Sequence, residues 1–111
     1  MKQMHVSDEQ FFVFDTNIGA RVRFLPGAHK HGVSAEDQLY VVEQARVIFL
    51  LEPSKERSRS EWLFLGASPQ GRLLEVIAVL GSHEHFLVIH AMPMRPKWDS
   101  LWQVVVGVEE Q

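Results

Sequence analysis

Two short stretches of this chain combine imidazole and cationic side chains, the groups that can move protons beside a developing negative charge. One stretch precedes a predicted helix and the other leaves the last predicted strand; their members are His29, Lys30 and His31, and His90, Arg95 and Lys97. Histidine can accept or donate a proton near neutral pH, and Lys and Arg stabilise an anionic phosphate. If the fold brings the two stretches together, a base, an acid and a cation are available in one place.

Each of these residues also has a structural interpretation. His29 and His31 could do no more than hydrogen-bond the turn before the helix. His90 lies between apolar residues and could be a buried, hydrogen-bonded histidine of a strand. Arg95 and Lys97 lie in a stretch interrupted by prolines and could be solvated. The sequence leaves these alternatives open.

The elements that would position these residues can be predicted from apolar periodicity and turn residues. Ser34, followed by acidic residues, suits the start of a helix that runs to about Arg46. Apolar or alternating runs predict strands at 11–14, 21–25, 47–51, 62–65, 72–80 and 86–90. The first two would form a hairpin, and the last three an antiparallel meander. Asp99 could cap a final helix, although residues 104–106 also suit a strand.

Length and composition predict one folded domain over residues 1–111. The chain is 46% hydrophobic and 23% charged, as globular proteins are. The order of elements predicts an α+β fold in which one or two helices pack on one face of an antiparallel meander sheet. No apolar run approaches the roughly 18 residues that span a bilayer, and the first ten residues are too polar for a signal peptide. The absence of cysteine suits a reducing compartment, and the cytoplasm is the expected location.

The net charge of −3 argues against a broad nucleic-acid-binding surface, because such surfaces need clustered Lys and Arg. Any contact with RNA phosphates must therefore be local. If the strand begins early, His83 and His85 share one face and could ligate a metal together with another histidine; the alternative is that they lie in a turn without a metal. The sequence contains no H-E-x-x-H, P-loop or Gly-x-Ser-x-Gly motif. No metal or other cofactor is expected.

Three segments of the chain occur in the order and approximate spacing of a known family: HKHGVS at 29–34, GASPQGRLL at 66–74 and VIHA at 88–91. Together they resemble the BrnT-type toxins, within the broader RelE/ParE-like group of toxin–antitoxin ribonucleases. The resemblance covers roughly residues 21–98. Family members tend to have an arginine soon after the final strand, in a Ser-Ala-Arg type of step, whereas here Ala91 is followed by Met92-Pro93-Met94 and the next arginine is Arg95.

The resemblance implies a RelE/ParE-like microbial ribonuclease fold and the toxin of a type II toxin–antitoxin system. Such a toxin is a metal-independent endoribonuclease that inhibits translation and is silenced by a cognate antitoxin, often a ribbon-helix-helix protein. The expected catalytic residues are His29, His31, His90 and Arg95, and the expected RNA-binding residues are Lys30, Arg72 and Lys97. The alternative is a non-catalytic protein-interaction module of the same fold, such as a homodimer formed through the apolar surface between Met92 and Trp102.

Overall fold

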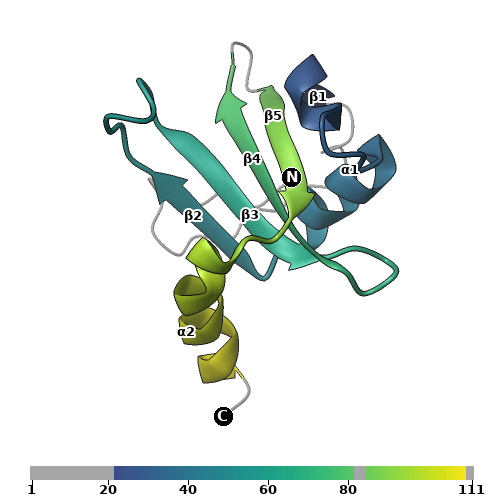
Figure 1. Ribbon diagram of the computed structural model, residues 1–111, viewed down its shortest axis with the longest axis vertical. Helices are drawn as coiled ribbons and strands as arrows, with labels where there is room; N and C mark the ends of the chain where they lie inside the picture. The colour runs from purple at the N-terminus through teal and green to yellow at the C-terminus, as the bar shows by residue number, and fades with distance from the viewer. Residues whose placement is uncertain (1–21, 82–84, 110–111) are drawn as a thin grey trace.

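The computed structural model describes residues 22–81 and 85–109, and a mixed five-stranded sheet forms its centre (Figure 1). In spatial order the strands are β1 (Val22–Phe24), β5 (Phe86–Pro93), β4 (Leu73–Leu80), β3 (Glu61–Ala67) and β2 (Val47–Leu51). The helices are α1 (Ala35–Gln44), α2 (Asp99–Glu109) and the short 3-10 helices η2 (Pro26–His29) and η4 (Pro96–Trp98). The architecture is therefore α+β.

The direction of β1 makes the sheet mixed rather than wholly antiparallel. β1 runs parallel to β5, with Val22 opposite Phe86 and Phe24 opposite Val88, while each of the other neighbouring pairs is antiparallel. The local periodicity of residues 21–25 predicts a strand, but it does not predict the partner of that strand, because β5 is distant in the sequence. The predicted first strand of the N-terminal hairpin, 11–14, lies outside the described residues.

The start of α1 follows from its capping residue. The Ser34 hydroxyl oxygen accepts a hydrogen bond from the Asp37 backbone N–H at 3.1 Å, and acidic residues occupy the first turn. The helix ends at Gln44, two residues before the predicted end, because the backbone of Ala45 is extended. The chain then enters β2 at Val47.

The turn between β3 and β4 confirms the predicted hairpin. Ser68 donates its backbone N–H to the Arg72 carbonyl at 2.8 Å, and its hydroxyl accepts from the Arg72 N–H at 3.2 Å. Gly71 adopts a φ of 87°, a left-handed conformation that favours glycine. Pro69 and the glycine therefore act as the turn residues that reverse the chain.

The two α-helices cover opposite faces of the sheet, so the expectation that helices pack on one face only is wrong. Buried residues of one cluster join Val41 and Val42 of α1 to alternate positions of β3 and β4, including Phe64, Leu74, Val76 and Ala78. The other alternate positions, including Leu63, Leu65 and Ile77, pack with Leu101, Trp102 and Val105 of α2. A strand that carries apolar side chains on both of its faces must be covered on both faces. The C-terminal segment, for which the sequence left helix and strand open, is thus a helix.

Neither helix of the described part of the chain has the length and apolarity needed to cross a membrane.

Candidate active site

A register shift in β5 turns His90 to the face of the sheet that carries α2. His90 lies opposite Ile77 and Val88 lies opposite the next residue of β4, so Ile89 has no partner across the ladder. The side chains of a regular strand alternate between the two faces of the sheet, so without this register shift Val88 and His90, two residues apart, would share a face. Val88 instead points into the core beneath α1, whereas Ile77 belongs to the cluster beneath α2. The extra residue therefore places His90 on the same face as Glu75.

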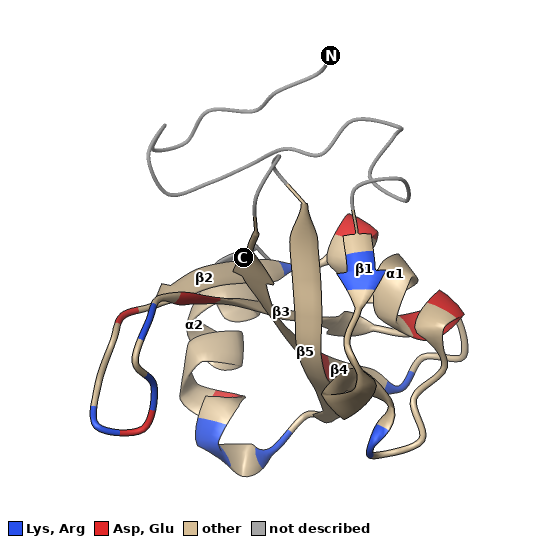
Figure 2. Cartoon of the chain, turned by 90° about the horizontal axis from the view of Figure 1, so that it is seen from above, with Lys and Arg blue, Asp and Glu red and all other residues tan. Residues whose placement is uncertain are grey.

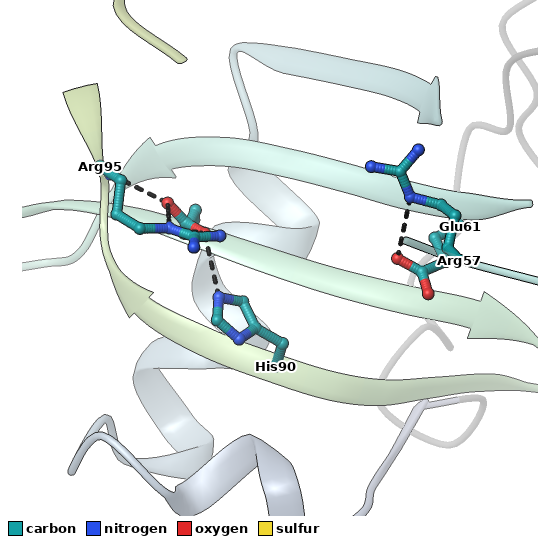
Figure 3. A network of polar contacts seen from close by, with 5 residues as sticks. Arg57, Glu61, His90 and Arg95 are labelled. Carbon is teal, nitrogen blue, oxygen red and sulfur yellow. Dashed lines mark hydrogen bonds and ion pairs between the residues drawn. The ribbon is translucent and has the colours of Figure 1, made fainter. Parts of the chain in front are cut away.

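Glu75 is the centre of a polar network at this point of the sheet (Figure 3). Its side chain is fully buried, and its Oε2 lies 2.9 Å from Nε2 of His90. The Arg95 backbone N–H donates to Oε1 at 2.9 Å, Nε–H donates to both oxygens at 3.0 and 3.1 Å, and Nη2–H donates to Oε2 at 2.6 Å. We call Glu75, His90 and Arg95 the carboxylate network. The buried charge of Glu75 is thus compensated by hydrogen bonds and by the bidentate contact with the Arg95 cation.

The carboxylate network determines the protonation of its members. Burial opposes ionisation of Glu75, but the hydrogen bonds from His90 and Arg95 outweigh it and lower the pKa of Glu75 to about 2. The same hydrogen bond to Glu75 raises the pKa of Arg95. An ionised carboxylate can only accept, so Nε2 of His90 must carry the proton in this contact. A neutral His90 ring then keeps its lone pair at Nδ1.

A second imidazole lies next to His90. The rings of His31 and His90 meet edge to face, with centroids 5.7 Å apart and an interplanar angle of 72°. His31 is exposed, and the His90 side chain is 24% exposed, so both rings are open to solvent. We call His31 and His90 the imidazole pair. Two groups able to accept or donate protons thus lie side by side, one of them held by an ionised carboxylate.

Gln38 fixes the segment that carries His31. The Gln38 side chain is fully buried beneath α1, and its Nε2 donates to the carbonyls of Ala28 at 2.7 Å and Val33 at 2.9 Å. These two carbonyls bracket residues 29–32. One buried amide therefore ties both ends of the His31 segment to the helix.

The same segment packs directly on β5 through Gly27. A Cβ added at Gly27 would lie 2.9 Å from the carbonyl oxygen of Ile89, closer than side chains approach a backbone. Glycine here allows η2 to lie against the strand at the residue that shifts the register. Gly32, with a φ of 77°, then turns the chain toward α1.

Of the predicted site residues, the structure brings together His31, His90 and Arg95. His29 is exposed and turns its ring toward Phe24, with centroids 6.2 Å apart, and Nζ of Lys97 lies 4.9 Å from the centre of the Trp98 ring. The remaining two, Lys30 and Arg72, are exposed in the segment before α1 and in the β3–β4 turn. The blue segments leading into α2 in Figure 2 belong to the stretch with Arg95 and Lys97.

Glu75 and Gln38 were not among the site residues predicted from the sequence. The available signal for Glu75 was a single acidic residue within the apolar strand Leu73–Leu80, and for Gln38 a long amide on the apolar face of a helix. Buried Glu and Gln are rare unless they have partners, so either position could have been singled out. Their partners, however, lie in distant parts of the chain.

Within residues 22–81 and 85–109, no three His, Asp or Glu side chains are grouped so that they could hold a metal ion. Of the suggested His83 and His85 pair, His83 lies outside the described residues.

Comparison of the chain with protein-family models, with curated proteins and with solved structures gives no match. The carboxylate network and the imidazole pair are therefore the features of the described residues that bear most directly on function.

Proposed function

We propose that this chain is a metal-independent endoribonuclease that acts in the cytoplasm as the toxin of a type II toxin–antitoxin system. The observation that carries the proposal is the imidazole pair: the rings of His31 and His90 lie 5.7 Å apart, and His90 is hydrogen-bonded to the buried, ionised Glu75. Two adjacent imidazoles provide the base and the acid that RNA cleavage needs without a metal.

In the proposed reaction, Nδ1 of His90 accepts the proton of a 2′-hydroxyl group. The 2′-oxygen attacks the adjacent phosphorus, the bond from phosphorus to the 5′-oxygen breaks, and His31 donates a proton to that leaving oxygen. The products are a 2′,3′-cyclic phosphate and a free 5′-hydroxyl. Glu75 does not touch the substrate; it is a positioning residue that orients His90 and stabilises the imidazolium as it forms.

Arg95 has a divided role in this proposal. Its Nε and Nη2 hold Glu75, but its side chain is 38% exposed, and Nη1 is outside the hydrogen bonds to the carboxylate. Nη1 is therefore the atom through which Arg95 would contact the phosphate. Because Glu75 balances much of the charge of Arg95, exposed cations such as Lys30 would add to phosphate binding.

The direct test is an RNA cleavage assay with the purified full chain in the presence of EDTA. We expect RNA fragments ending in a 2′,3′-cyclic phosphate and no cleavage of DNA of the same sequence, which lacks the attacking hydroxyl. His90→Ala and His31→Ala should each lower the rate by about 10²- to 10⁴-fold. Lys55→Ala, which removes an exposed cation of the β2–β3 loop, is the matched control and should not. The proposal would be refuted if the chain cleaved neither free mRNA nor ribosome-bound mRNA.

The wider biological role follows from the resemblance of the segments at 29–34, 66–74 and 88–91 to the BrnT-type toxins. A sheet of this α+β class, with helices on it, is compatible with the proposed RelE/ParE-like fold. Expression of the chain alone should arrest growth, and co-expression of a ribbon-helix-helix protein encoded next to it should relieve the arrest. Arrest that His90→Ala does not abolish would separate toxicity from the proposed chemistry.

A second candidate is a non-catalytic interaction module. Glu75 is fully buried and accepts several hydrogen bonds from Arg95, and both observations favour this candidate. The carboxylate network would then serve only to attach the segment that follows β5 to strand β4. The net charge of −3 also suits a protein partner better than RNA. In that case the His31→Ala and His90→Ala variants would bind the partner as the parent chain does, and no RNA would be cleaved.

A further inference from the structure

We propose that two copies of this chain form a homodimer in which β2 pairs antiparallel with β2 of the second copy, centred on Phe49. β2 is the last strand of the sheet order, and among the described strands it has a hydrogen-bonded neighbour, β3, on one side. The edge of a regular strand presents backbone N–H and C=O groups that can pair with another strand. The inference does not depend on the proposed ribonuclease function.

The sequence of β2 lacks the features that usually prevent edge pairing. Its five residues are Val-Ile-Phe-Leu-Leu, without a charge or a proline, and all five pair with β3 in unbroken register. Natural edge strands are commonly protected by an inward charge, a proline or a bulge. Phe49, the central residue, remains 46% exposed. β2 is thus a regular, apolar edge with a large exposed ring at its middle.

The residues around Phe49 are complementary to themselves when the strand is reversed. Antiparallel pairing centred on Phe49 places Ile48 opposite Leu50 of the second copy and Val47 opposite Leu51. At both ends it places Arg46 opposite Glu52 of the second copy, so two pairs of opposite charge close the paired segment. A register shifted by two residues would lose both charge pairs. This charge complementarity selects a second copy as the occupant of the edge.

The position of Phe49 adds an apolar contact at the two-fold axis. Phe49 lies opposite Leu63 of β3 and therefore on the α2 side of the sheet, where it would face Phe49 of the second copy. Cross-strand aromatic pairs of this kind stabilise sheets. A paired segment of this length is small for a protein interface, so the dimer should be reversible and depend on concentration.

The proposed dimer does not cover the carboxylate network or the imidazole pair of either copy. In the carboxylate network, Glu75 lies on β4, His90 on β5 and Arg95 after β5, so β3 separates the nearest strand of the network from β2 (Figure 1). The two copies would form one continuous sheet with the imidazole pairs toward its distant ends.

Sedimentation equilibrium of the full chain tests the proposal. We expect the weight-average mass to rise with concentration from 12.8 kDa toward twice that value. Arg46→Glu alone and Glu52→Arg alone should each be monomeric, because each places like charges opposite one another. The double variant should dimerise again, and the two single variants should form a heterodimer when mixed. Arg23→Glu, a charge reversal on the exposed side of β1 at the other edge, is the matched control and should leave dimerisation unchanged.

Three results would overturn the proposal: a monomer at all concentrations, a dimer that neither single reversal weakens, or no heterodimer on mixing. A monomer would leave the edge to another occupant, such as residues 1–21 or a different protein. Thermal unfolding of the single variants shows whether each is folded, and the mixing experiment does not require either to dimerise by itself.

Discussion

Glu75 and Arg95, on β4 and after the end of β5, form a bidentate ion pair in which Nη2 lies 2.6 Å and Nε 3.1 and 3.0 Å from the carboxylate oxygens. The backbone N–H of Arg95 also donates to this carboxylate at 2.9 Å. The pair therefore fixes both the side chain and the path of the chain as it leaves the sheet. The same carboxylate also forms a hydrogen bond with Nε2 of His90.

The first prediction concerns stability. Arg95→Met should lower the free energy of unfolding by about 3–5 kcal/mol, because it leaves Glu75 buried without its cation. The double variant Glu75→Met with Arg95→Met should lose less, since neither charge remains buried. Urea unfolding at pH 7 measures both. A single variant that costs under about 1 kcal/mol would show that the carboxylate finds other partners.

The second prediction concerns acid. The pKa of Glu75 falls from its ordinary value of 4.5 to about 2 on folding, so the unfolded chain binds the proton more readily. The stabilisation from Glu75 is therefore fully present above about pH 4.5 and is lost as the pH falls toward 2. Its size is on the order of 3 kcal/mol. Urea unfolding between pH 7 and 2 should show this loss in the parent chain and a shallower slope in Glu75→Gln.

The third prediction separates positioning from substrate binding. Glu75→Gln should lower kcat by about 10²-fold or more while KM changes little, because the carboxylate orients His90 without touching RNA. Lys30→Ala should instead raise KM. Steady-state kinetics on a short RNA measures both constants. A rise in KM with unchanged kcat for Glu75→Gln would contradict a positioning role.

The fourth prediction tests the segment that carries His31. Gln38→Met removes the two hydrogen bonds to the Ala28 and Val33 carbonyls, and should cost about 1–3 kcal/mol for each buried group left unsatisfied. It should also weaken the ring contact between His31 and His90, seen as fewer proton–proton NOEs between them. Gln44→Met, an exposed glutamine at the end of the same helix, is the control and should change neither.

The fifth prediction compares two glycines. Gly27→Ala should destabilise the fold and move η2 away from β5, because the new Cβ would lie 2.9 Å from the Ile89 carbonyl oxygen. In Gly107→Ala the Cβ has open space within a helix, and the higher helix propensity of alanine should stabilise by up to about 1 kcal/mol. Thermal unfolding of the two variants should therefore shift in opposite directions. Equal shifts would mean that η2 does not rest on the strand.

Local features of this chain could be predicted from the sequence because their causes lie within a few residues. The hydroxyl of Ser34 caps the helix that follows it, and Gly71 supplies the left-handed residue of the β3–β4 turn. Apolar runs likewise indicate β2, β4 and β5. The histidines at 31 and 90 could be singled out by type alone.

Long-range relationships could not be predicted in this way. Only the folded sheet makes β1 parallel to β5, and only the unpartnered Ile89 turns His90 toward Glu75. A buried carboxylate is stable only where partners from distant segments reach it, and nothing near Glu75 in the sequence reveals Arg95 as that partner. The sequence by itself thus determined most of the helices, strands and turns, with the C-terminal segment left open between helix and strand, and it determined which side chains could do chemistry. Tertiary structure decided which of these side chains meet, because contacts across a sheet depend on strand order and register rather than on neighbouring residues.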